Sequence, residues 1–437
     1  MVRTRIGAIA SLGLLIACTG TRTGNPNDPG PEGPDLPDGV DLVRSTLARE
    51  AAPDVSLDDR MQLGLNNQRF AFDLYGEAAR NDGNLFFSPY SISLAMAMTY
   101  AGAEAETERE MAEVLHFALP EPELHAAFNA TDVALAQRAK PIEFEGMEHD
   151  GMELSIVNAA FTQRDLPFEE AFLDVLALHY GAGMYTLDFT GGPEESRETI
   201  NDWAADRTEQ RILDLLPERS LSERVALVLA NAIYFKANWA IPFDVDETTD
   251  GVFHAPAGDV TAAMMNGTIQ GQYAAGDGYQ ALELPYVPTS VRAVFILPEQ
   301  GRLEEIEAAL GTIFLDVRGQ LSTHIVTMAV PRFRYGAKLE LKTLLSELGM
   351  PDAFTEGVAD FSDITRERSL HIDEVYHQAF VALDEHGTEA AASSAVVLPG
   401  RGVSPPAEFV LNRPFVFVIY DEPTDQILFL GRLSDPT

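Results

Sequence analysis

Arg401 is the residue of this chain that is best placed to bind an acidic group on a partner. It is the only cation in the stretch from Glu385 to Ser404, EHGTEAAASSAVVLPGRGVS, and a glycine stands on each side of it. A guanidinium on such a flexible stem can extend from the protein and bind a carboxylate through charge-assisted hydrogen bonds. From the residues alone, a solvated arginine in a loop is the default interpretation.

The motifs that mark nucleophiles, zinc sites or phosphate loops are missing from the sequence. It has no G-x-S-x-G, H-E-x-x-H or G-x-x-x-x-G-K-[ST] motif, and its nine histidines lack metal-ligand spacing. Cys18 is the only cysteine, so the folded part has neither a disulfide nor a thiol nucleophile. Asp244, Asp246 and Asp250 suggest a calcium loop, but the closing glutamate is absent, and a solvated acidic turn is expected instead. We expect no enzyme activity, no metal and no cofactor.

The residues before Arg401 alternate in size and charge. Read with a period of two, the segment has one face that is uncharged and mostly small, and Glu389 lies on the opposite face. The uncharged face comprises Thr388, Ala390, Ala392, Ser394, Val396 and Leu398. The segment could therefore enter a sheet as a strand without burying an unpaired charge. A small-residue linker or a short helix is the other interpretation, because alanine has a high helix propensity and a poor strand propensity.

Strands are predicted on both sides of this stretch, at residues 375–384 and 409–420, because both runs are rich in apolar, β-branched or aromatic residues. We expect further strands at 154–161, 225–235, 281–284, 291–297 and 326–333. Helices are expected at 62–80, 89–100, 104–115 and 339–348, the second of them started by Ser88 and Pro89. The irregular order of strands and helices favours an α+β fold.

Charge and hydropathy limit the class of partner. The 437 residues include 68 acidic and 30 basic side chains, which gives a formal charge of −38. A mean hydropathy of −0.05 is typical of a soluble globular protein. Such acidity makes long-range attraction to nucleic acids or heparin-like polyanions improbable, so we expect no nucleic-acid partner.

The N-terminus has the pattern of an exported protein. Residues 1–17 join Arg3 and Arg5 to an apolar run too short to span a bilayer, which indicates a signal peptide. Leu15-Ile16-Ala17-Cys18 looks like a bacterial lipobox, with Cys18 as the lipidated residue; an ordinary signal peptide with an incidental cysteine is the alternative. Residues 18–39 are rich in proline and glycine and predict an extended tether. Residues 40–56 form an approach segment, weakly helical at 42–50.

The run from Glu385 to Ser393, EHGTEAAAS, resembles the hinge of inhibitory serpins. Further blocks resemble the same family in the same order, namely NLFFSPYSIS at 84–93, NAIYFKANWAIPF at 231–243, HIDEVYHQA at 371–379 and NRPFVFV at 412–418. The resemblance covers residues 57–437. It implies the serpin fold, with several helices around three β-sheets and an exposed reactive-centre loop.

The resemblance also implies a role for particular residues. Counting from the hinge places the scissile bond at Arg401-Gly402, whereas counting back from Asn412 places it near Val403-Ser404. The implied hinge comprises Glu385, Gly387, Thr388, Glu389, Ala390, Ala391, Ala392 and Ser393. The polar shutter, at which a sheet must part, matches Ser88, Ser91, Asn231 and His377; Trp239 matches the start of insertion, and Arg332 pairs with Glu385. Taken singly, Ser88 is also explained as a helix cap, and His377 and Trp239 as core residues.

A serpin-like chain with these residues is expected to inhibit serine proteases. Arg401 implies a trypsin-like target, trapped as a covalent acyl complex by a monomeric inhibitor. Only Arg138 and Lys140 stand where some serpins bind heparin, so no such cofactor is expected. The chain would be exported and anchored by lipid at a bacterial envelope, periplasmic or at the cell surface, or else secreted. The alternatives are a non-inhibitory serpin that acts as a binding or chaperone-like protein, and a secreted hydrolase with an unrecognised site.

Overall fold

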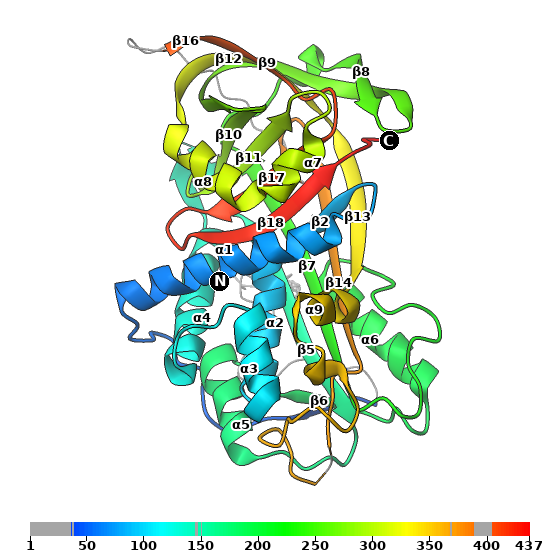
Figure 1. The fold of residues 1–437 in the computed structure, drawn as a ribbon. Helices are drawn as coiled ribbons and strands as arrows, with labels where there is room; N and C mark the ends of the chain where they lie inside the picture. Colours follow the sequence, from blue (N-terminus) through cyan, green and yellow to red (C-terminus); the bar gives the residue numbers. More distant parts are fainter. Residues whose placement is uncertain (1–35, 37–38, 145–146, 150, 368, 389–403) are drawn as a thin grey trace, which may run out of the picture.

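Long strands run through the middle of the molecule and join its two ends (Figure 1). The computed structural model describes residues 36, 39–144, 147–149, 151–367, 369–388 and 404–437. The central sheet has the order β13, β14, β7, β5, β6, β1. Its strands are β1 (Asp41–Val43), β5 (Glu153–Gln163), β6 (Met184–Leu187), β7 (Leu227–Trp239), β13 (Phe333–Glu340) and β14 (Glu374–Leu383), with the two-residue β15 (Gly387–Thr388) beside β7 and β14.

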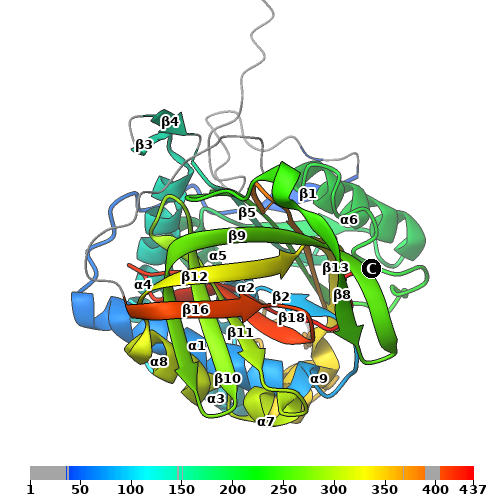
Figure 2. The ribbon, with the colours of Figure 1, turned by 90° about the horizontal axis from the view of Figure 1, so that it is seen from above.

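Two further sheets are joined to the central one. The second has the order β9, β10, β11, β17, β18, β2, and the third has the order β8, β9, β12, β16. Seen from above, β9, β12 and β16 lie across the other strands (Figure 2). The strands are β2 (Leu85–Phe87), β8 (Thr249–Ala255), β9 (Gly258–Gly276), β10 (Tyr279–Val287), β11 (Val291–Pro298), β12 (Ser322–Pro331), β16 (Ser404–Val410), β17 (Phe415–Asp421) and β18 (Gln426–Leu433), while β3 (Ile142–Phe144) and β4 (Met147–His149) form a separate hairpin.

Helices surround these sheets, and one of them lies inside. Every residue of α2 is buried, and the helix packs on β5, β7 and β18. Ser88 starts it by accepting a hydrogen bond from the backbone of Ser91, which satisfies a donor that the helix leaves open. The helices are α1 (Leu57–Ala78), α2 (Pro89–Tyr100), α3 (Ala105–Val114), α4 (Glu121–Ala136), α5 (Glu170–Val175), α6 (Pro193–Arg207), α7 (Leu303–Ala308), α8 (Leu310–Gln320) and α9 (Leu341–Leu348). No helix of the described ranges is both long and apolar enough to cross a membrane.

The predicted elements mostly match, with three corrections. The strand expected at 326–333 crosses from β12, which ends at Pro331, into β13, which begins at Phe333. The single strand expected at 409–420 is two strands in different sheets, because the chain turns at 411–414 and Pro414 has no N–H to donate to a ladder. The weak helix expected at 42–50 is wrong. Residues 41–43 instead pair with β6, Val40 is buried, and Arg49 reaches Asp132 on α4 at 2.7 Å, so tertiary contacts override a weak local propensity.

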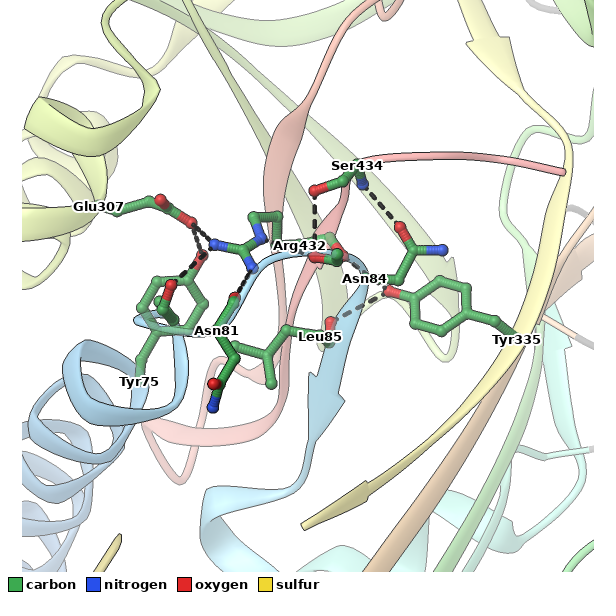
Figure 3. Close-up of polar contacts among 10 residues, drawn as sticks. Tyr75, Asn81, Asn84, Leu85, Glu307, Tyr335, Arg432 and Ser434 are labelled. Atoms are coloured by element: carbon green, nitrogen blue, oxygen red, sulfur yellow. Dashed lines mark hydrogen bonds and ion pairs between the residues drawn. The ribbon is translucent and has the colours of Figure 1, made fainter. Parts of the chain in front are cut away.

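Arg432 on β18 joins three distant parts of the chain (Figure 3). Its guanidinium donates to the carbonyls of Gly83 (2.9 Å), Ala79 (3.2 Å) and Asn81, which follow α1, and it lies 3.0 Å from Glu307 on α7. The Tyr75 hydroxyl donates to the same carboxylate at 2.7 Å. Only 6% of the Arg432 side chain and 10% of the Glu307 side chain are exposed. The pair is therefore buried and has further hydrogen bonds, the setting in which removal of one partner is costly.

Arg432→Met should destabilise the protein by about 3–5 kcal/mol, because it leaves the Glu307 carboxylate buried without its cation. The free energy of unfolding in urea measures the loss. Adding Glu307→Gln to the variant should recover part of it, since no buried charge then remains. A loss under about 1 kcal/mol, the range of exposed ion pairs, would contradict the assignment.

Candidate functional site

The seam between β7 and β14 is the feature around which the predicted site residues gather. The two strands pair in parallel from Glu374 and Val228 up to Ala379 and Ile233. Above that point β15 lies between them and pairs antiparallel with both, Thr388 being opposite Ala237 on β7 and Leu383 on β14. The segment that leads to the predicted reactive loop therefore already occupies the upper end of the seam.

Gly387 is required where β15 enters the seam. Its φ is +154°, and a Cβ at this position would lie 2.1 Å from the carbonyl oxygen of Ala237 and 2.8 Å from the Cα of Asn238. Both neighbours are backbone atoms of a central strand, which cannot move aside cheaply. Only glycine fits where β15 and β7 approach each other this closely.

Thr388 is held by an aromatic pair at the top of β7. Its side chain is buried, and its hydroxyl lies 2.8 Å from the hydroxyl of Tyr286. Tyr286 stacks on Trp239 with ring centroids 4.3 Å apart. The Trp239 indole N–H donates to the carbonyl of Asp384 at 3.1 Å, and its backbone N–H donates to that of His386 at 2.8 Å. Trp239 thus contacts the hinge directly instead of only filling the core.

Glu385 is fixed more by a hydroxyl than by its predicted ion pair. The Thr248 hydroxyl donates to its carboxylate at 2.7 Å, whereas the nearest Arg332 nitrogen is 3.4 Å away and half of the Arg332 side chain is exposed. Burial alone would raise the pKa of Glu385, but the Thr248 bond, a backbone bond and the Arg332 charge together hold that pKa below its usual value. The carboxylate therefore stays charged at the mouth of the seam.

The predicted shutter residues meet halfway down the seam. His377 on β14 lies opposite Asn231 on β7, and both are buried. The backbone N–H of Ser88 donates to Nε2 of His377 at 3.1 Å, so this ring nitrogen is an acceptor and Nδ1 carries the proton that Asn231 accepts. The amide of Asn231 in turn donates to the Ser91 hydroxyl at 2.7 Å and to Asn158.

Burial keeps His377 neutral. It lowers the pKa of His377 to about 3, because the imidazolium form would lose its hydration inside the sheet. Each polar group in this cluster has a partner, which is the condition for burying polar groups at low cost. The cluster joins β7, β14, β5 and the start of α2 through hydrogen bonds that each involve a side chain, so these bonds can exchange partners without breaking a strand.

The two cations considered for a polyanion site lie at the end of α4. Arg138 donates to the carboxylate of Asp421 at 2.8 Å, and Asp421 is completely buried. That guanidinium is used to join α4 to β17. Lys140 directly follows the short 3₁₀ turn of residues 137–139 that contains Arg138.

Several predicted residues lie outside the described residues. These are Arg401, Gly402, Cys18 and the hinge residues Glu389, Ala390, Ala391, Ala392 and Ser393. Other residues at the seam escaped sequence reasoning, namely Tyr286, Thr248, Asn158 and Asp373. Asn158 has a visible signal, because it is a single amide inside the apolar run of β5. Tyr286 reaches the seam through the register of β10 on β7, Thr248 lies directly before β8, and Asp373 lies directly before β14, so none of the three has a local signal.

Comparisons with known proteins agree with this arrangement. Residues 65–436 match the family model described as "Serpin (serine protease inhibitor)". An uncharacterized serpin-like protein of Thermococcus kodakarensis is 38% identical over 371 residues, which cover 84% of each chain. Human antithrombin-III is 33% identical over 389 residues, which cover 86% of this chain and 82% of the relative.

A solved structure shows the same fold. The native state of tengpin, a thermophilic serpin, matches with a TM-score of 0.79 and 24% identity over 90% of this chain and 99% of that chain. The family model, the relatives and the fold agree over the same part of the sequence. The chain belongs to the serpin family, whose members are generally protease inhibitors and not catalysts.

Proposed function

We propose that this chain inhibits trypsin-like serine proteases by inserting its reactive loop into the seam. The observation that carries the proposal is β15, whose residues Gly387 and Thr388 lie between β7 and β14 and pair with both. A sheet that already holds these two residues offers the edges of β7 and β14 to the residues that follow them in the chain. The following alternate side chains are uncharged and mostly small, so they would enter without burying a charge.

In this mechanism the protease supplies the nucleophile. Its serine attacks the carbonyl of Arg401, the bond to Gly402 breaks, and the new amine leaves while the acyl-enzyme ester forms. The residues that follow Thr388 then enter the seam and draw the tethered protease along the molecule, where its active site is deformed before water can release it. The guanidinium of Arg401 gives the preference for a trypsin-like pocket. A cut at Val403-Ser404 instead would imply an elastase-like target.

We further propose that the inhibitor acts as a monomer outside a bacterial cytoplasmic membrane. Residues 1–17 would direct export, Cys18 would carry the lipid, and residues 18–39 would hold the domain away from the bilayer. Contact with the membrane would be through this lipid only. The use of Arg138 by Asp421 supports a mechanism that needs no heparin-like cofactor.

The proposal is tested by mixing the protein with trypsin and separating the products on a denaturing gel. A band that survives boiling, with the mass of both proteins, is expected for the wild type. Arg401→Ala should reduce that band at least about 100-fold, because the charged anchor of the primary pocket is lost. Arg366→Ala, which removes an arginine with a 69% exposed side chain elsewhere, is the control and should leave the band unchanged. Digestion of the wild type without any complex would refute inhibition.

Thr388→Arg should convert the inhibitor into a substrate. Thr388 is already 1% exposed in the seam, so an arginine there would either bury an unpaired charge at a cost of several kcal/mol or force β15 out of the seam, and the rest of the loop could not continue from it. We expect trypsin to cut the loop while the yield of complex falls at least about tenfold, since 1.4 kcal/mol already gives that factor. Thr388→Val has a similar shape and no charge, and should still form complex. Equal yields from Thr388→Arg and wild type would exclude insertion at this residue.

Acid should weaken the native state through His377. The pKa of His377 is about 3 in the folded protein and about 6.5 in the unfolded chain. The unfolded state therefore takes up the proton first as the pH falls. The free energy of unfolding should therefore fall by up to about 1.4 kcal/mol per pH unit between pH 6.5 and 3. Urea unfolding at several pH values measures this slope. In His377→Gln this contribution to the pH dependence of the unfolding free energy should be missing. Identical slopes for the variant and the wild type would show that His377 does not titrate as stated.

A further inference from the structure

Asp373 closes the lower end of the seam with its side chain. It stands directly before β14, and one of its carboxylate oxygens accepts hydrogen bonds from the backbone N–H groups of Ala226 (2.6 Å) and Leu227 (3.0 Å), where β7 begins. Its own backbone N–H donates to the carbonyl of Leu227 at 2.9 Å. These three bonds continue the contact between β7 and β14 past Glu374 and Val228, where the parallel pairing ends.

The surroundings hold this carboxylate in place. Nε2 of His371 lies 3.1 Å from its second oxygen, and both side chains are mostly buried. Lys342 on α9 donates to the Asp373 carbonyl at 2.9 Å. The N–H groups that Asp373 accepts belong to Ala226 and Leu227, which are themselves buried and would be costly to leave without a partner.

We propose that Asp373 is a positioning residue that stabilises the closed seam and not the open one. This inference rests on the proposed function, because it requires a strand to enter between β7 and β14. Such a strand must separate Asp373 from Leu227, which breaks all three bonds. The backbone of the new strand then supplies carbonyl groups next to β7, so the N–H groups no longer need the carboxylate. Asp373 therefore sets how readily the last part of the seam opens.

The test compares Asp373→Ala with wild type as full-length protein, intact and after limited proteolysis within residues 389–403. Asp373→Ala should lower the melting temperature of the intact protein by about 2–4 °C and leave that of the nicked protein within about 1 °C of wild type. A synthetic peptide with the sequence of residues 388–398 should enter the intact variant about tenfold faster. Asp188→Ala removes a carboxylate that accepts the Gly191 N–H at 2.8 Å, away from the seam, and should not change the uptake.

The outcomes separate this inference from the proposed function. If nicking fails to raise the melting temperature of wild type, the proposed insertion itself is refuted. If nicking does raise it, but Asp373→Ala lowers both forms equally and peptide uptake is unchanged, Asp373 is an ordinary strand cap and the inference is overturned. Should Asp373→Ala fail to fold, Asp373→Asn and His371→Ala are compared in the same way. Asp373→Asn keeps an oxygen that can accept the two N–H groups, whereas His371→Ala removes the group that holds the carboxylate in place. Asp373→Asn should therefore lower the melting temperature of the intact protein less than His371→Ala does.

Discussion

The backbone edge of β7 is the constraint on which the rest of this structure depends. A strand in the middle of a buried sheet must have a partner for its N–H and C=O groups on both sides. On one side β5 pairs with β7 over most of its length. On the other side β14 pairs with it in parallel only from Val228 to Ile233, β15 pairs with Ala237 and Asn238, and the Trp239 N–H donates to the carbonyl of His386. This edge of β7 is therefore paired in separate short pieces, and neither β14 nor β15 pairs with residues 234–236.

This division gives the sheet a second way to satisfy the same edge. A strand that continued from Thr388 would pair antiparallel with both β7 and β14, as β15 does now. One parallel pairing would be replaced by two antiparallel ones, and antiparallel pairs are slightly more stable per residue. The proposed gain in stability after cleavage thus has a source in backbone hydrogen bonding. It does not require strained residues elsewhere.

Side chains decide when that exchange is possible. From Leu229 to Ile233 and from Val375 to Ala379 the seam has no acidic residue, lysine or arginine, and its polar groups are amides, hydroxyls and a neutral imidazole. Such groups can change partners without leaving a buried charge unpaired. Charged groups stand at its two ends instead, with Glu385 at the top and Asp373 at the bottom. Under the proposed function, the Asp373 bonds at the lower end are the charged contacts that insertion must break.

The sequence predicts the parts of this site that have a local signal. Ser88 and Pro89 mark the start of α2, the glycine and small residues after Glu385 mark the hinge, and the apolar run around Asn231 marks a central strand. Tyr286 and Asp373 have no such signal, because they reach the seam only through the register of β10 on β7 and the length of β14. The same reason explains the error at 409–420, where local composition is that of one strand and tertiary pairing makes two.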